Sequence, residues 1–186
     1  MKIQKIQKLC KSAKRIIIFN AKNGVQWISD GYCIYPLFNL PRLSRENIFA
    51  MFDIPADKQG KIYFEEREGL PEGLDFGDTA RGENVVTTEA YSIYAHGRTL
   101  EPVKCSQGAL LLDAKYLAPF DDVTLYERTK STGVPYIAVK EGMLLAGIIL
   151  PFETHSDLGE WLVNMGELII TNSENAAQSS LVDQEE

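Results

Sequence analysis

The spacing of apolar side chains near the start of the chain predicts an amphipathic helix. In residues 2–14 the apolar side chains fall within about a third of a helical wheel turned by about 100° per residue. These side chains are Ile3, Ile6, Leu9, Cys10 and Ala13. The rest of the wheel carries lysines, so we expect one face of the helix to pack on a core and the other to meet solvent.

Three short runs of apolar residues follow this helix, with turn residues between them. Residues 15–21 and 25–30 predict two strands joined by a hairpin turn at Asn23-Gly24. Residues 32–37 predict a third strand after a second glycine turn. The chain therefore opens with one helix and a three-strand meander.

Residues 44–105 interrupt this regular pattern. Ser44 is the expected N-cap of a helix over residues 45–53, and residues 61–66 predict a strand. The buried stripe of this helix would consist of Ile48, Phe49 and Phe52. Residues 67–84 are rich in glycine and acidic side chains, so we expect a mobile loop there.

A second helix and meander follow in residues 109–150 and repeat the order of the first. After strands at 87–95 and within 100–105, residues 109–113 predict a strand and residues 114–120 a short helix. Three strands complete the unit, at residues 123–128, 135–140 and 143–150. This weak internal repeat is the main clue to the architecture, although a general alternation of strands and glycine turns would also explain it.

The end of the chain predicts one more helix and a tail. Residues 156–170 place Leu158, Trp161, Leu162, Met165 and Ile169 on one helical face, after a cap at Ser156 or Asp157. We therefore expect an α+β domain over 1–152 with an insertion at 44–105, a C-terminal helix within 153–170, and a disordered acidic tail over 171–186.

Composition and charge narrow the possible classes of protein. Hydrophobic residues make up 45% and charged residues 24% of the 186 residues, which is typical of a globular domain. The longest apolar runs are too short to cross a bilayer and the N-terminus does not resemble a secretory signal, so we expect a cytoplasmic protein. The net charge of −7 hides an asymmetry, because residues 1–29 contain no acid whereas residues 153–186 contain eight carboxylates and no Lys or Arg.

The sequence contains no recognised catalytic or cofactor motif. Glycine-rich nucleotide loops, nucleophile elbows and zinc signatures are all missing, so we expect no catalytic residue, no cofactor and no metal. His96 and His155 lie beside turns without a partner at a recognised spacing. Acidic clusters at 65–68 and 121–122 could hold a divalent cation, but such carboxylates are more often solvated. The cysteines are expected to be packed, reduced thiols, and they are Cys10, Cys33 and Cys105.

The lysine-bearing face of the first helix is the main candidate site. A solvated surface is the simplest explanation, but no acid lies between the lysines, so the helix lacks the ion pairs between successive turns that such surfaces usually carry. A surface of one sign attracts polyanions, of which nucleic-acid phosphate is the commonest. An anionic membrane is less suitable, because the apolar face has no Trp or Phe anchor. The expected nucleic-acid contacts are Lys2, Lys5, Lys8, Lys11, Lys14 and Arg15.

Aromatic side chains could add a platform on which bases stack. The candidates are Trp27, Tyr32, Tyr35, Tyr91 and Tyr94. Aromatic residues on strands more often belong to the core, and we expect that role for most of them.

The second unit resembles the closing unit of the bacterial DNA polymerase III sliding clamp, or beta clamp. The resemblance rests on residues 113–152, with the Tyr116-Leu117 pair and an Ile-rich last strand ending at Pro151, while residues 2–38 resemble the same unit without its first strand. It implies a sliding-clamp-like α+β domain of two helix-plus-three-strand units with an antiparallel sheet. It also implies helices that offer basic residues to duplex DNA. The chain further resembles uncharacterised small proteins of prophages and integrative elements.

Two functions follow from these observations. The leading hypothesis is a non-enzymatic clamp-like module in DNA metabolism, in a mobile element, that contacts DNA through its basic N-terminal helix. The alternative is a protein-interaction or assembly protein without nucleic-acid binding, in which the acidic C-terminal helix of one copy packs on the basic helix of another. Both imply protein partners or self-association, and neither implies a membrane.

Overall fold

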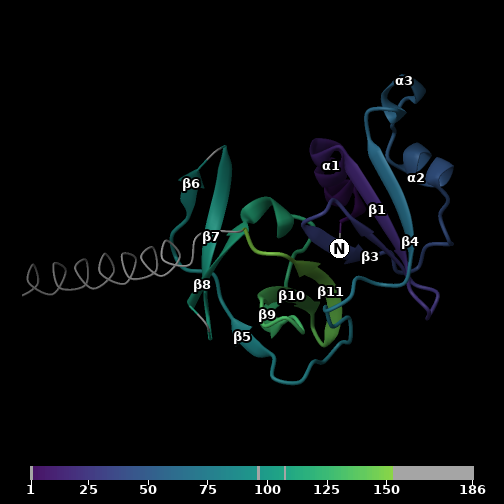
Figure 1. Cartoon of the computed structure of the whole chain (residues 1–186). Helices are drawn as coiled ribbons and strands as arrows, with labels where there is room; N and C mark the ends of the chain where they lie inside the picture. The colour runs from purple at the N-terminus through teal and green to yellow at the C-terminus, as the bar shows by residue number, and fades with distance from the viewer. Residues whose placement is uncertain (1, 96, 107, 153–186) are drawn as a thin grey trace, which may run out of the picture.

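The computed structural model describes residues 2–95, 97–106 and 108–152, and it shows a mixed α+β protein (Figure 1). The predicted α+β class is therefore confirmed. The predicted C-terminal helix and tail lie outside the described residues. Within the described part of the chain, no helix is long and apolar enough to cross a membrane.

The first unit is a helix followed by a three-strand meander, as its sequence pattern predicts. Ile6, Leu9 and Cys10 are the buried residues of the helix. The first hairpin turns at Gly24, whose φ of 84° lies in the left-handed region that glycine adopts without strain. The elements are α1 (Ile3–Ala13), β1 (Arg15–Asn20), β2 (Gln26–Ser29) and β3 (Cys33–Pro36).

The inserted region contributes helices and strands at both edges of the fold. Ser44 caps the predicted helix, and its side chain accepts a hydrogen bond from the Asn47 N–H while the Asn47 side chain accepts one from the Ser44 N–H. The elements are α2 (Arg45–Met51), α3 (Ala56–Gln59), β4 (Tyr63–Glu68), β5 (Asn84–Val86), β6 (Ile93–Ala95) and β7 (Arg98–Cys105).

The second unit begins with a strand and a single helical turn. Asp113 caps this turn by accepting a hydrogen bond from the Lys115 N–H at 3.3 Å. The elements are β8 (Gly108–Asp113), the 3₁₀ helix η1 (Ala114–Tyr116), β9 (Thr124–Thr129), β10 (Pro135–Glu141) and β11 (Leu144–Ile149).

Eight strands form one sheet in the order β4-β1-β2-β3-β11-β10-β9-β5, and β6-β7-β8 form a smaller sheet. The two units meet where β3 and β11 pair antiparallel, with Ile34 opposite Ile148. Their helical segments lie on the same face of the large sheet, because the Lys2 N–H donates to the Pro119 carbonyl at 2.7 Å. In Figure 1, α1 lies over β1 and the small sheet stands on the far side of η1.

Several predicted elements differ from the structure. The sheet is not wholly antiparallel, since β4 runs parallel to β1 after a crossover through α2 and α3. The predicted helix at 114–120 is only one 3₁₀ turn, because Pro119 ends any continuation. The predicted strand at 87–95 is reduced to β6, and neither α3 nor β5 was expected.

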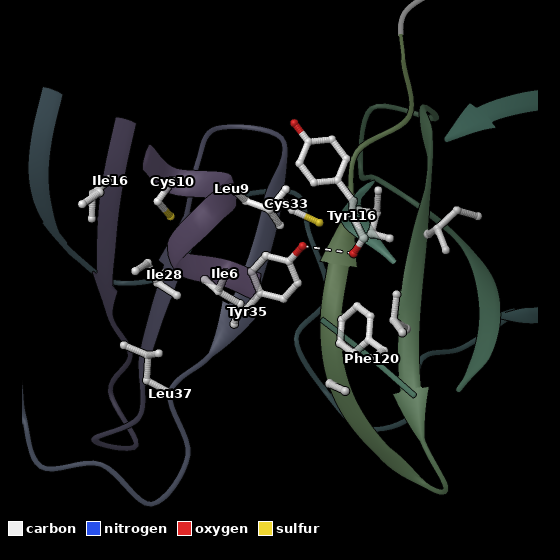
Figure 2. Close-up of a cluster of buried hydrophobic side chains, with 14 of the residues drawn as sticks. Ile6, Leu9, Cys10, Ile16, Ile28, Cys33, Tyr35, Leu37, Tyr116 and Phe120 are labelled. Carbon is white, nitrogen blue, oxygen red and sulfur yellow. Dashed lines mark hydrogen bonds between the residues drawn. The ribbon is translucent and has the colours of Figure 1, made fainter. Parts of the chain in front are cut away.

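The two faces of the large sheet carry separate cores. The helix-covered face, represented by Ile6, Ile28 and Tyr35, packs α1, α2 and η1 on the sheet. Figure 2 shows this core, in which the Tyr35 hydroxyl donates to the Tyr116 carbonyl at 3.1 Å. The loop-covered face, represented by Trp27 and Tyr136, lies instead under the segment between β4 and β5.

The segment that covers this second face is residues 69–83. It contributes three partly buried side chains, Leu70, Leu74 and Phe76, and the Phe76 ring meets the Trp27 ring edge-on at 5.0 Å between centroids. The expected mobility of this loop stays a prediction. Its apolar side chains nevertheless give it a structural role, since they shield the loop-covered face from water.

Candidate nucleic-acid interface

The apolar stripe of α1 fixes where its lysines lie. Ile6, Leu9 and Cys10 are buried on the sheet, so Lys5 and Lys8, on the opposite side of the helix, are exposed to solvent. The helix ends at Ala13, and the C-cap residue Lys14 has a left-handed φ of 51° and an N–H that donates to the Cys10 and Lys11 carbonyls. The Gln7 side chain ties the helix to the inserted region by donating to the Phe52 carbonyl at 2.6 Å.

The structure separates the six predicted contact residues into four groups. Lys2 forms an exposed ion pair with Asp121 of the second unit. Lys5 and Lys8 are exposed, and neither has an ion-pair partner among the described residues. Arg15 leaves the helix and places its guanidinium over the Tyr63 ring, 5.3 Å from the ring centroid.

The remaining two residues, Lys11 and Lys14, line a pocket of about 370 Å³ together with Lys58 and Lys61 from the inserted region. Its apolar floor consists of Ile54, Pro55 and Ile62, and Asp53 is the only acidic residue among the lining residues. We call this the lysine pocket. Within the described ranges, none of its four lysines forms a salt bridge, so the pocket carries a net positive charge.

Hydrogen bonds within the inserted region and to the end of α1 hold the segment that carries the inserted lysines. Pro55 is the N-cap of α3, and the Gln59 side chain donates to the Ile54 carbonyl at 3.2 Å. The chain then enters β4, where the Tyr63 N–H donates to the Lys14 carbonyl at 3.0 Å. That bond joins the end of α1 to the segment carrying Lys58 and Lys61.

The sequence pattern did not predict Lys58 and Lys61 as site residues. They are almost fifty residues from α1, and the parallel pairing of β1 with β4 brings them together. The available signal was local and weak: two lysines separated by Gln59 and Gly60, just before a strand.

Most of the candidate stacking aromatics are buried or partly buried. Trp27 and Tyr35 are buried, and Tyr91 is partly buried. Tyr94 is 78% exposed on β6 and does not line the lysine pocket, whereas Tyr32 is half-exposed beside the end of α1.

The thiols are packed, as expected. Cys10 and Cys33 are buried, and burial raises the pKa of both well above the usual thiol value. Burial followed by the charge of Glu127 raises the pKa of Cys105 to about 12. All three thiols are therefore protonated near neutral pH, and none is activated as a nucleophile.

The acidic clusters take part in ion pairs and hydrogen bonds. Glu65 pairs with Arg67 at 2.7 Å, and the Asn20 side chain donates to both Glu66 and Glu68. Across the residues whose positions are described, no group of three or more His, Cys, Asp or Glu side chains is placed to hold a metal ion.

The chain matches no known protein-family model, and neither the curated proteins nor the solved structures contain a significant match to it.

Proposed function

We propose that this protein is a non-enzymatic module that binds nucleic acid through the lysine face of α1, extended by Lys58 and Lys61. The observation that carries the proposal is the lysine pocket, in which four lysines from two distant segments converge without a salt bridge among the described residues. Bringing like charges together is unfavourable unless an anion neutralises them. A chain of phosphates supplies that anion repeatedly, and exposed Lys5 and Lys8 continue the positive surface along the helix.

The conformation of Lys14 also supports a role for its side chain. A left-handed residue at the end of a helix is usually glycine, because a Cβ atom is disfavoured there. Lysine at this position therefore destabilises the helix end slightly, by about 1 kcal/mol. We therefore infer that the ammonium group of Lys14 has a functional role that offsets this cost.

We further propose that the module is clamp-like. The proposal is supported by the continuous sheet that joins the two meanders through β3 and β11, with helical segments on one face. The second helical segment carries only Lys115, so most nucleic-acid contacts would come from the first unit and the inserted lysines.

Titration of a fluorescent DNA duplex at several salt concentrations tests the nucleic-acid proposal. If about four lysines contact phosphates, the logarithm of the binding constant falls with the logarithm of salt concentration with a slope of about −4. The double substitution Lys58→Glu and Lys61→Glu should weaken binding strongly and reduce the slope by about 2. The two substitutions should not impair folding, because the Lys58 and Lys61 side chains are exposed.

A matched control changes the same amount of charge elsewhere. Lys22 and Arg81 are both exposed and do not line the lysine pocket, so Lys22→Glu with Arg81→Glu should leave the slope nearly unchanged. Absence of binding at low salt would overturn the proposal. Equal losses in the two double variants would also overturn it, because binding would then depend on total charge alone.

A protein-assembly role is favoured by one feature of the sequence, the eight carboxylates of residues 153–186. If these residues pack on the lysine face of another copy, sedimentation without DNA should show self-association that weakens as salt is added. The Lys58→Glu and Lys61→Glu variant would then be more monomeric than the wild type. A monomer at every salt concentration would exclude this role.

A further inference from the structure

A second cleft lies on the other flank of α1, away from the lysine pocket. Its volume is about 920 Å³, within the range of small-molecule sites. The end of α1, the turn between β2 and β3, the start of β7 and the helical turn η1 surround it. We call it the polar cleft, and it shares no lining residue with the lysine pocket.

The unequal helices of the two units explain why a cleft forms here. α1 has 11 residues, whereas η1 has 3 and leaves the neighbouring part of the helix-covered face without a long helix. The start of β7 occupies the opposite side of that space, with Arg98 and Thr99 among the lining residues. In Figure 2, the Tyr116 ring extends from η1 toward the C-terminal end of α1.

Three cations line the cleft, and they are not equally neutralised. Asp113 lies 2.9 Å from the Lys115 ammonium and 3.9 Å from the Arg98 guanidinium. Arg15 forms no salt bridge within the described ranges, although the hydrogen bonds and charge of Arg67, together with the charge of Arg15, lower the pKa of Glu65. The Arg15 side chain lies against Gly31, where an added Cβ would come within 3.1 Å of the guanidinium, and it also covers the Tyr63 ring. The Arg15 guanidinium is thus held in position but keeps its charge available for an anion.

An aromatic surface stands beside these cations. Tyr32 is 49% exposed, and its ring stacks on the Tyr116 ring with 6.3 Å between centroids and 30° between planes. Tyr116 itself is buried, so it supports the Tyr32 ring, which keeps about half of its surface exposed. A half-exposed, supported ring is a surface on which a planar group can stack.

The cleft also has an incompletely bonded carboxylate in its wall. Asp30 is buried, and its Oδ1 atom accepts hydrogen bonds from the Tyr32 and Cys33 N–H groups at 3.0 and 3.1 Å. Its Oδ2 atom has no hydrogen-bond partner among the described residues. Burial, followed by the charge of Asp30, raises the pKa of Tyr116, so the Tyr116 hydroxyl lies close to this carboxylate. A buried acceptor of this kind favours a ligand that carries an N–H or O–H donor.

We propose that the polar cleft binds a nucleotide, with its phosphate near Arg15 and Arg98, its base against Tyr32, and a donor group of the ligand directed toward Asp30. A nucleotide combines the three chemical features that the cleft recognises: an anion, a planar ring and hydrogen-bond donors. The same chemistry is present in a free mononucleotide and in one unit of a single strand. The proposal does not depend on duplex binding, because it involves a different set of lining residues.

Calorimetric titration of the full chain with adenosine 5′-monophosphate, adenosine and inorganic phosphate tests the proposal. We expect the nucleotide to bind at least about tenfold more tightly than either fragment, since only the nucleotide meets both the cations and the ring. Tyr32→Leu should weaken nucleotide binding by about tenfold or more, and Tyr32→Phe should preserve it. Arg15→Gln should weaken the binding of the nucleotide and of phosphate but leave the binding of adenosine unchanged.

Two controls separate this cleft from other surfaces. Tyr94→Leu removes a more exposed ring on β6 that does not line the cleft, and it should leave nucleotide affinity unchanged. The Lys58→Glu and Lys61→Glu variant should also bind the nucleotide as tightly as the wild type does, even if it no longer binds duplex DNA. Loss of nucleotide binding in that variant would assign the nucleotide to the lysine pocket and overturn the proposal.

A short single-stranded oligonucleotide distinguishes the two sources of the ligand. If it binds more tightly than the mononucleotide and is weakened equally by Tyr32→Leu, the cleft accepts one unit of a strand. If the mononucleotide binds more tightly, the free nucleotide is the ligand. The proposal fails if no nucleotide binds at concentrations up to about 10 mM. It also fails if phosphate alone binds as tightly as the nucleotide and Tyr32→Leu has no effect.

Discussion

The two faces of the eight-stranded sheet are covered by different means. On the helix-covered face, α1 and α2 place regular apolar stripes on the strands, and side chains such as Ile6 and Ile48 are fully buried. On the loop-covered face, residues 69–83 contribute only partly buried side chains. Apolar burial alone therefore stabilises the packing of α1 and α2 on the sheet far more than the packing of residues 69–83.

Buried ion pairs compensate for this difference on the loop-covered face. Arg128 donates hydrogen bonds to the carbonyls of Asp75 and Gly77 at 2.9 Å, and its guanidinium pairs with Glu83 at 2.6 Å. Lys140 pairs with the other oxygen of Glu83. The Arg128 and Lys140 side chains are only 2% and 3% exposed, so Glu83 provides the charge that makes their burial possible.

The substitution Glu83→Gln should have the largest effect on stability. It leaves two buried cations without their carboxylate, and breaking a buried pair in this way costs about 3–5 kcal/mol. Urea unfolding at neutral pH measures this loss. Hydrogen exchange should show residues 69–83 becoming less protected before the strands of the helix-covered face do.

An exposed ion pair and a pH series provide the controls. Glu65→Gln removes the carboxylate of the pair with Arg67 at the sheet edge, and it should cost less than about 1 kcal/mol. Burial alone would raise the pKa of Glu83, but the hydrogen bonds and charges of Lys140 and Arg128 outweigh it and hold the pKa below 4.5. The stabilisation is therefore present above pH 4.5 and is lost as the pH falls through the lowered value. A Glu83→Gln deficit that stayed constant across this acid range would contradict the assignment.

The contrast between the faces also shows what sequence patterns can predict. The stripe of α1 and the Ser44 cap depend on residues a few positions apart, and the structure confirms both. The cover of the second face depends on Glu83 meeting Arg128, 45 residues later in the chain. The local composition of this segment is that of an acidic, glycine-rich loop. Composition cannot indicate a partner in a distant part of the chain, so the covering role of the segment was not predicted.

For the candidate sites, too, local patterns predicted some residues, and contacts between distant segments determined the rest. Periodicity located Lys11 and Lys14 on the outer side of α1, but it could not show that Lys58 and Lys61 complete their pocket. The polar cleft was also hidden, since Arg15 and Arg98 come together only when the small sheet stands beside the end of α1. Tertiary contacts, rather than local pattern, assemble both sites.

A pair of similar truncations, one on each face, should give the next largest effects. Ile6→Ala removes a fully buried side chain from a close-packed core and should cost about 2–5 kcal/mol. Leu74→Ala removes a partly buried side chain from the loop cover, where less area leaves water, and should cost about 1–2 kcal/mol. Thermal unfolding of the two variants under the same conditions compares them. Equal losses would show that the loop packs as tightly as the helix.

The smallest expected effect comes from the cap of α2, which helps cover the helix-covered face. Ser44→Ala removes the side-chain oxygen that accepts from the Asn47 N–H at 3.3 Å, and loss of such a cap costs about 1 kcal/mol. Ser44→Asp should restore most of the stability, because aspartate also accepts this hydrogen bond. Urea unfolding measures both variants. Since Ile48 and Phe49 remain buried against the sheet, the loss of stability should stay well below that of Ile6→Ala. A comparable loss would mean that α2 depends on its cap more than on its packing.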